Sequence, residues 1–548
     1  MLINLVLFLT LGAPDIVVLN ASLPTVPGAD AVAIEKGRFV AIGASADVRK
    51  LADKKTRLID AEARMVLPGL IDSHVHFSSG GAGIKNVDLN GATTVEEMVL
   101  RIKAWAKAHP EATWISGRGW SYDVFKRLNP PYPTRQMLDS AIPGRPVFVR
   151  AYDGHTGWAN SAALKVCNIT DATPEPSEGR ILREKNGVTP TGALLEDAMD
   201  LIFSCMPKPT SAETRQAILA AQELGLSLGL TAVNDFVAAP DVLDAYLALD
   251  QEGLLKIRVF FSPSLEETPL EQAKAMRERI AASGHRLRFG SLKGFADGVI
   301  ESLTAAFLKP YATTEDNLGT LHLNGKRLEE LVVPADEAGF AVSLHCVGDR
   351  AVRTALDAYE HAAKVNGTHD RRHRIEHIEI LDPADAPRFA KLGVIASMQP
   401  FHAELSDHPG EGVWEVNAAG DRLLHSFAWH DVLAAKGTLA FGSDWTVTTL
   451  DPLKGLALAT SRSTGHGLPE GGWIPGQKIS FAQAVEAYTR SAAFALHAEQ
   501  DLGAIEKGKA GDLVILNPKV DGAEPLSLYW GSVDAVIIGG NVAFERAP

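Results

Sequence analysis

Cysteine, net positive charge and long apolar runs are all scarce in this sequence. Of its 548 residues only Cys167, Cys205 and Cys346 are cysteines, too few and too scattered for a disulfide framework or a thiolate zinc site. The net charge of −14 argues against a nucleic-acid-binding surface, which needs basic patches. No apolar run reaches the length of about 18 residues that a transmembrane helix requires. The remaining composition, 46% hydrophobic and 22% charged, is typical of a globular protein larger than one ordinary domain.

The first 13 residues form an apolar extension. They resemble the apolar core of a signal peptide, but they lack its basic start, and Pro14 is a poor residue after a cleavage site. Residues 14–20 then have the pattern of a strand, so a buried first strand of the folded protein is the alternative interpretation. Periplasmic or secreted and cytoplasmic locations both stay open, with export slightly favoured.

Both ends of the chain contain short β-rich runs with a hairpin turn between them. Residues 15–60 contain a hairpin turn at Lys36-Gly37, and residues 502–546 contain a second one at Gly539-Gly540. Neither end supplies enough strand to bury the face of a sheet alone. We therefore predict one small composite β-sandwich domain, built from residues 14–64 and 500–548.

Between these ends, eight apolar runs alternate with segments rich in Ala, Leu, Glu and Lys. This alternation predicts an α/β fold, a (β/α)8 TIM-like barrel over residues 65–499. The expected strands are 65–76, 231–236, 256–261, 287–295, 341–345, 373–377, 394–398 and 439–444. The expected helices include 212–228, 271–283, 327–338, 350–364 and 482–495.

One connection in the predicted barrel is far longer than an ordinary loop. Roughly 150 residues separate the first two strands, so the sequence predicts an inserted subdomain at about residues 80–228. A loop that follows a barrel strand lies on the catalytic face. We therefore expect the insertion to wall the substrate pocket.

The first predicted barrel strand ends in two histidines, His74 and His76. Side chains two residues apart on a strand point the same way, so two imidazoles leave this strand together. This is a compact way to offer two nitrogen ligands to one metal ion. Other strand ends carry polar residues as well, namely Lys293, His345, His377 and Asp444. Four histidines and an aspartate suit zinc or a similar divalent metal.

With these motifs the chain resembles the amidohydrolase superfamily, and within it the large branch that contains N-substituted formamide deformylase. The resemblance spans nearly the whole chain. It is highly specific for the superfamily and weakly informative about substrate. The matching motifs are Pro68–His76, Arg118–Trp120, Asp153–Trp158, Leu292–Gly298, His345–Asp349, Ile375–His377, Met398–Pro400 and Gly442–Asp444.

The resemblance implies a centre of two zinc ions. His74 and His76 would hold the more buried ion, and His345 and His377 the more exposed one. Lys293, carboxylated on its nitrogen, would bridge both ions. The alternative for Lys293 is an ordinary lysine paired with Asp297 or Glu301.

Asp444 would touch the buried metal and act as the acid and base of the reaction. Bridging water would provide hydroxide, and Asp444 would take its proton and return it to the leaving nitrogen. His155, in the insertion, is a further catalytic candidate that would bind the substrate or its oxyanion, or else would only order its loop.

The remaining candidates would line or support the site, each with a purely structural role as the alternative. Asp297 and Glu376 would hold the ligands in place. The expected substrate-binding residues are Trp120, His155, Trp158, Gln399, His402 and Trp445.

The resulting functional prediction is a metal-dependent hydrolase that cleaves a non-peptide carbon–nitrogen bond, in an amide or an N-acyl or N-formyl amine, by attack of a metal-bridging hydroxide. Hydrolysis of a lactone or ester, or deamination, on the same metal site is the second interpretation. A non-enzymatic scaffold of the same fold is the third. The expected partners are a small-molecule substrate and, by analogy with the family alone, a second copy of the chain. Nucleic acid is not expected as a partner.

Overall fold

The computed structural model describes residues 13–129, 131–177, 179–237, 241–284, 286–404 and 408–547. Almost all of the apolar extension, residues 1–12, lies outside this description. The first described strand is β1 (Ile16–Leu19), which agrees with the strand predicted over residues 14–20. Within the described ranges, no helix combines the length and the apolar character needed to cross a membrane.

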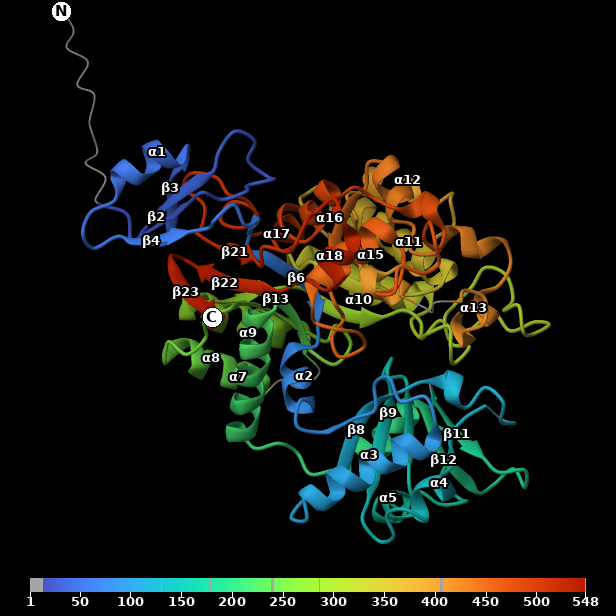
Figure 1. Cartoon of the computed structure of the whole chain (residues 1–548). Coiled ribbons are helices and arrows are strands. Elements are labelled where there is room, and N and C mark those ends of the chain that lie inside the picture. Colours follow the sequence, from blue (N-terminus) through green and yellow to red (C-terminus); the bar gives the residue numbers. More distant parts are fainter. Residues whose placement is uncertain are drawn as a thin grey trace, which may run out of the picture.

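Two four-stranded sheets pack on each other where the chain begins and ends (Figure 1). One has the order β3-β2-β1-β4 and the other β23-β22-β21-β5. Their strands are β2 (Ala31–Glu35), β3 (Arg38–Gly43), β4 (Arg57–Asp60), β5 (Val66–Pro68), β21 (Leu513–Leu516), β22 (Val533–Ile538) and β23 (Asn541–Glu545). Both predicted hairpins are present, and Val18, Ile34, Leu513 and Ile537 share one buried cluster. The two ends of the chain therefore share a core.

The eight apolar runs all form parallel strands, in two sheets. The first has the order β15-β14-β13-β6 and the second β16-β17-β18-β19-β20. Their bounds are β6 (Leu70–Val75), β13 (Leu230–Val237), β14 (Arg258–Pro263), β15 (Leu287–Phe289), β16 (Leu292–Phe295), β17 (Val342–Cys346), β18 (Arg374–His377), β19 (Ile395–Met398) and β20 (Thr438–Phe441). The fourth predicted strand is divided between β15 and β16. The prediction of an α/β fold is thus confirmed.

The two sheets contact each other at two places. Ser264, just after β14, forms a parallel bridge with Lys293 of β16. On the other side, the Ser73 hydroxyl donates to the carbonyl of Phe441 at 2.7 Å. Strands β6 and β20 are therefore neighbours, as are β14 and β16.

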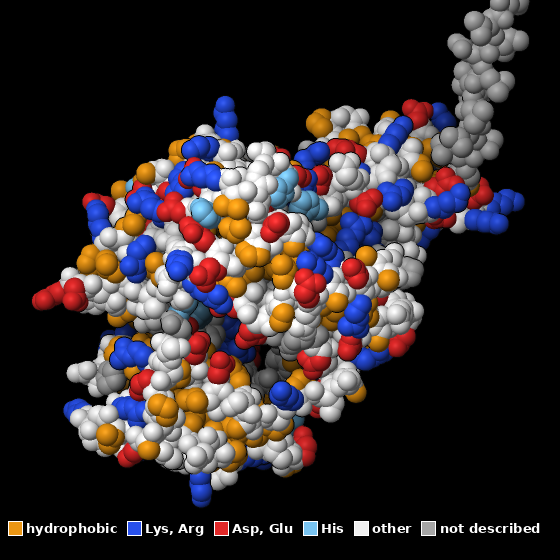
Figure 2. Space-filling view, turned by 180° about the vertical axis from the view of Figure 1, so that it is seen from behind, with side chains coloured by type: hydrophobic (Ala, Val, Ile, Leu, Met, Phe, Trp, Pro, Cys, Tyr) orange, Lys and Arg blue, Asp and Glu red, His pale blue; other side chains and the backbone are white. Residues whose placement is uncertain are grey.

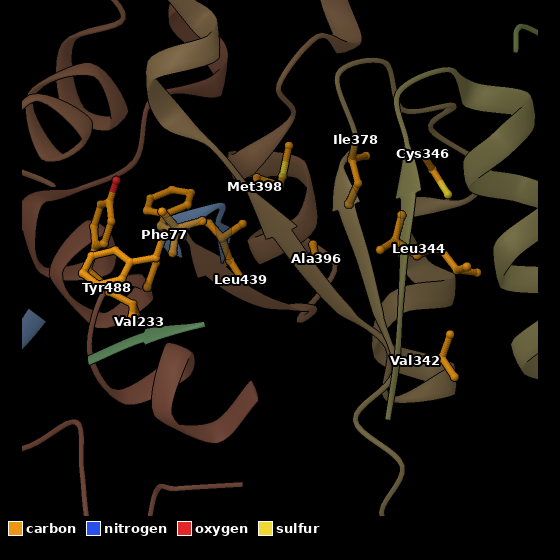
Figure 3. Packing of buried hydrophobic residues seen from close by; sticks show 14 of the residues in the cluster. Phe77, Val233, Val342, Leu344, Cys346, Ile378, Ala396, Met398, Leu439 and Tyr488 are labelled. Carbon is orange, nitrogen blue, oxygen red and sulfur yellow. The ribbon is translucent and has the colours of Figure 1, made fainter. Parts of the chain in front are cut away.

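Helices cover the outer faces of these strands. They include α2 (Phe77–Gly83), α7 (Ser211–Ser227), α9 (Leu270–Ser283), α10 (Gly325–Glu337), α11 (Asp349–Asn366), α16 (Phe481–Ala487) and α17 (Arg490–Ala495). The sequence predicted α16 and α17 as one helix. Figure 3 shows Val342, Leu344 and Cys346 of β17 in the buried apolar cluster. Because neighbours on a strand point to opposite faces, His345 lies on the face away from this cluster.

The long connection after β6 contains a separate sheet, seen at the bottom of Figure 1. Its strand order is β11-β12-β10-β9-β8-β7. The bounds are β7 (Val87–Asp88), β8 (Ile115–Trp120), β9 (Val147–Ala151), β10 (Thr156–Ala159), β11 (Gly179–Arg183) and β12 (Pro190–Glu196), with α3 (Val95–Ala108) beside them. We refer to residues 87–196 as the insertion. It buries its own apolar cluster, distinct from that of the parallel strands.

Two cysteines at this end of the molecule are paired, a cross-link that the sequence did not predict. Cys167 and Cys205 form a disulfide with their Cα atoms 5.6 Å apart, although 38 positions separate them in sequence. Cys346 is a free, buried thiol in β17. The cysteines are too few for a framework, but two of them do cross-link the chain.

Candidate metal centre

Three of the predicted ligands come together at the carboxyl ends of the parallel strands. His74 lies in β6, His377 is the last residue of β18, and Asp444 follows β20. Each is buried, and each offers a ligand atom within 4.8 Å of the others. His377 (φ 75°) and Asp444 (φ 54°) take a left-handed backbone conformation. This conformation is uncommon for residues other than glycine and is concentrated at functional sites.

The two predicted ligands His76 and His345 lie beside this group. His76 Nε2 is 3.4 Å from Asp444 Oδ1, the same distance as His74 Nε2. The ring centroid of His345 is 4.4 Å from that of His377. All five residues therefore surround one space.

Hydrogen bonds fix which nitrogen of each imidazole faces this space. His74 Nδ1 is 2.7 Å from Glu376 Oε2, and His76 Nδ1 is 3.1 Å from the carbonyl oxygen of Phe236. These oxygens can only accept, so Nδ1 carries the proton and Nε2 keeps its lone pair in the neutral ring. His345 is reversed, because its Nε2 bonds to the carbonyl oxygen of Gly298.

Several buried polar atoms in the same place have no hydrogen-bond partner among the residues that the structure describes. They are His74 Nε2, Lys293 Nζ, His402 Nε2 and Asp444 Oδ1. A buried donor or acceptor left unpaired costs about 1–3 kcal/mol. Imidazole nitrogens and a carboxylate oxygen are the donor types that zinc accepts. The set therefore fits a divalent metal.

Burial and charge place these groups in the protonation states that a metal needs. Burial lowers the pKa of His345 and of His377 well below the ordinary value, so both rings are neutral. Burial alone would raise the pKa of Asp444, but His74 and His402 outweigh it and hold this pKa well below its usual range. Neutral imidazole and ionised carboxylate are the ligand forms.

Lys293 is enclosed rather than paired. Its Nζ lies 5.0 Å from the ring centroid of Phe236 and 4.8 Å from that of Phe295. Burial lowers the pKa of Lys293 to about 8. Asp297, one of its alternative partners, instead accepts from the backbone N–H groups of Ala306, Val347 and Gly348. Nothing in the described structure therefore accepts a hydrogen bond from the lysine.

Both predicted supporting carboxyl groups hold strand ends. Glu376 contacts His74 and also accepts from Arg374 Nε at 2.8 Å. Burial would raise the pKa of Glu376, but Arg374 and His74 lower it to about 2. Burial raises the pKa of Asp297 to about 8 despite its three backbone donors. Because the N–H groups of Val347 and Gly348 donate to it, Asp297 anchors the backbone that follows His345.

Gln399 and His402 contact the ligands directly. Gln399 Oε1 accepts from His377 Nδ1 at 2.8 Å, which orients that ring. His402 Nε2 lies 3.5 Å from Asp444 Oδ2, and its Nδ1 lies 3.1 Å from Glu379 Oε1. Glu379 is absent from the sequence prediction, because it follows the end of β18, where strand alternation no longer applies.

The insertion contributes His155 to the edge of the centre. Its ring centroid is 5.5 Å from that of His345, and its Nδ1 is 2.6 Å from Glu196 Oε2. Burial alone would lower the pKa of His155, but the Glu196 carboxylate outweighs burial and raises this pKa to about 9. Figure 2 shows a hollow between the insertion, at the bottom, and the body of the molecule.

The predicted aromatic lining is largely wrong. Trp120 and Trp158 are fully buried in the apolar cluster of the insertion, where their Nε1 atoms donate to the carbonyls of Val149 and Thr134. They are core residues because their rings fill the space between strands and loops of the insertion. Trp445 is partly buried, and its carbonyl accepts from His76 N at 2.9 Å. Only Trp445 therefore adjoins a predicted ligand.

Comparison with known proteins agrees with this geometry. Residues 57–544 match the model of the amidohydrolase family. The chain is 33% identical over 518 residues to Protein LONG AFTER FAR-RED 3 of Arabidopsis thaliana, covering 92% of this chain and 87% of the relative. It is 27% identical over 521 residues to N-substituted formamide deformylase of Arthrobacter pascens, covering 92% and 93%. It also resembles the structure of an uncharacterized metal-dependent hydrolase from Pyrococcus horikoshii OT3, with a TM-score of 0.73, 25% identity and coverage of 93% and 98%.

Proposed function

The chain belongs to the amidohydrolase family, and from this premise we propose that it is a metal-dependent hydrolase of non-peptide carbon–nitrogen bonds, with N-acyl and N-formyl amines as its substrate class. The convergence of unpartnered buried atoms of His74, Lys293 and Asp444 carries this proposal. The relative named as a formamide deformylase and the neighbour described as a metal-dependent hydrolase support it.

We propose that the centre holds two divalent metal ions, zinc being the expected one. His74, His76 and Asp444 would hold one ion, and His345 and His377 the other. Lys293 would lie between them as a carbamate, in which the neutral amine adds to carbon dioxide, forms a carbon–nitrogen bond and loses a proton. The unpartnered Nζ of Lys293 and its lowered pKa support this step. Such ions, when bound, lower the pKa of water and polarise a carbonyl.

The protein's own residues would move the proton and hold the reacting groups. Asp444 would accept a proton from the attacking water and deliver it to the leaving nitrogen, because an amine anion is a very poor leaving group. His402 would hold Asp444 in position, since it lies between Asp444 and Glu379. His155 would bind the substrate oxygen from the side of the insertion.

We propose that the two parallel sheets form one (β/α)8 barrel within residues 65–499, flanked by a β-sandwich of residues 14–64 and 500–548. The bridge between Ser264 and Lys293 and the bond from Ser73 to Phe441 support closure at both edges. The insertion then covers the end of the barrel that bears the candidate ligands.

A substrate panel tests the proposed reaction. N-formyl amines, N-acyl anilines and lactones would be offered to the zinc-loaded protein, with release of amine, acid and ammonia measured separately. We expect amine and acid in equal amounts from the amides. Turnover of lactones alone would reassign the site to esters, and release of ammonia from a ring substrate would reassign it to deamination. A folded protein that retains no metal after zinc loading contradicts the catalytic proposal.

We also propose that the protein is exported to an oxidising compartment. The disulfide between Cys167 and Cys205 supports this, because such cross-links are rare in reducing cytosol. Alkylation of the protein in denaturant at lysis should modify one cysteine, Cys346. Three would contradict the proposal, and N-terminal sequencing would show whether residues 1–13 are removed.

A further inference from the structure

A polar cavity lies at the end of the parallel strands opposite the candidate metal ligands. It has a volume of about 220 Å³ and is bounded by the tips of the two terminal hairpins and by the amino ends of β14 and β15. The hairpin tips touch, because a Cβ on Gly37 would lie 3.1 Å from the carbonyl oxygen of Gly539. The lining residues are Lys36, Gly37, Arg38, Arg258, Arg286, Arg288, Asp501, Leu502, Ala510 and Gly539.

This cavity is strongly basic in a chain whose net charge is −14. Five of its lining residues are Lys or Arg, and only Asp501 is acidic. Asp501 is shared by Arg38 and Arg288, at 3.2 and 3.0 Å. Arg258 pairs with Asp512 through two bonds of 2.8 and 2.9 Å. Two carboxylates thus serve three arginines, and neither of them forms a bond with the fourth, Arg286.

Arg286 has an unsatisfied buried donor at this cavity. Its Nη1 is buried and has no hydrogen-bond partner within the described ranges of the chain. A Cβ placed on Gly539 would lie 3.6 Å from Nη2 of both Arg258 and Arg286, so these two guanidinium groups converge on the hairpin tip. Gly539 has φ 56° and no side chain to fill the space. An anion is the partner that converging guanidinium groups lack.

We propose that this cavity binds a small phosphate-type dianion, either free phosphate or a small phosphate monoester. Arg286 would be its main contact, with Arg258, Arg288 and Lys36 around it. The planar fork of a guanidinium group matches the oxygens of a phosphate in a bidentate arrangement. The cavity lies at the amino ends of the strands whereas the candidate metal ligands lie at the carboxyl ends, so this site is separate from the one proposed for hydrolysis.

Calorimetric titration of the zinc-loaded protein with inorganic phosphate, at constant ionic strength, tests the proposal. A charge-assisted hydrogen bond contributes about 1.5–3 kcal/mol, so Arg286→Met should weaken binding by about 10- to 100-fold. Arg279→Met is the matched control, because Arg279 pairs with Asp244 on the surface and lies away from the cavity. Phosphate should bind Arg279→Met as it binds the native protein.

Two further variants make the outcome decisive. Asp444→Asn should bind phosphate like the native protein, since Asp444 belongs to the metal centre. If Arg286→Met does not fold, Lys36→Met at the exposed rim should still weaken binding severalfold. Titration with glycerol 3-phosphate separates the two sources, because tighter binding than inorganic phosphate indicates a monoester and equal binding indicates free phosphate. Absence of saturable binding, an unchanged affinity in Arg286→Met or its loss in Asp444→Asn would overturn the proposal.

Discussion

The metal centre and the insertion that faces it differ in whether their buried polar groups have hydrogen-bond partners. At the strand ends, His74 Nε2, Lys293 Nζ and Asp444 Oδ1 are buried without hydrogen-bond partners in the described structure. In the insertion, Tyr122 bonds to both Asp153 and Thr156 at 2.8 Å, and other polar groups are similarly paired. The first region is arranged to bind something, and the second is arranged to keep its shape.

The energetic consequence of this difference is large. Each unpaired buried group costs about 1–3 kcal/mol, against a typical total stability of about 5–15 kcal/mol. A ligand that satisfies those atoms only in the folded state would offset the cost and stabilise the fold. We therefore expect metal binding to raise the unfolding temperature, and substitutions in the two regions to have different effects.

The largest effect is expected from Asp444→Asn in the metal centre. An asparagine cannot accept and return a proton, so kcat for amide hydrolysis should fall by about 10²- to 10⁴-fold. Asp357→Asn is the control, because Asp357 is an exposed partner of Arg388 and should leave kcat unchanged. Circular dichroism would verify the fold. Undiminished turnover in Asp444→Asn would remove this residue from the mechanism.

The insertion should respond in stability rather than in metal content. Trp158→Ala opens a cavity in a packed core and should lower the free energy of unfolding by about 3–5 kcal/mol. Trp530→Ala, on an exposed ring, should change it by less than about 0.5 kcal/mol. Denaturant titration gives both values, and elemental analysis should find the native metal content. A loss of metal in folded Trp158→Ala would contradict the separation of the two regions.

A smaller effect, on metal affinity, is expected from Glu376, which supports the candidate ligand His74. Glu376→Gln weakens the acceptor of His74 Nδ1, and loss of such a support typically costs about 10- to 100-fold in metal affinity. Competition with a chelator measures the affinity. Glu330→Gln, which alters an exposed pair with Arg327, is the control and should bind metal normally. An equal affinity in both variants would show that Glu376 supports the strand alone.

Features that follow from a repeating pattern along the sequence were predictable. Alternating side chains on a strand predicted that His74 and His76 point the same way, which agrees with their equal distances from Asp444, and the alternation of strands and helices located the strands of the two parallel sheets. The break between β15 and β16 was not visible, because both halves belong to one apolar run. Local periodicity reports which face a residue occupies, so it identifies candidates and not their contacts.

Features that depend on distance between remote segments were not predictable. Spacing in sequence does not reveal that Cys167 and Cys205 approach to 5.6 Å between Cα atoms. Trp120 and Trp158 each follow a glycine in their motifs, and such a motif is equally compatible with a ring that lines a pocket and with a ring in the core. Only the packing of the folded chain decides between these two places. Glu379 acquires a role only because the chain after β19 brings His402 to it.

The smallest effect should come from Glu196→Gln, where the insertion meets the metal centre. Glu196 raises the pKa of His155 to about 9, so the charged ring stabilises the fold fully below about pH 6.5, and this stabilisation is lost as the pH rises through 9. In metal-free Glu196→Gln, burial dominates and the pKa of His155 should fall below about 6.5. Proton NMR titration of the ring measures it, with Glu184→Gln, whose partner is Arg135, as the control. A pKa that stays near 9 would assign the charge on His155 to other groups, and the insertion would then be less self-contained than its hydrogen bonds indicate.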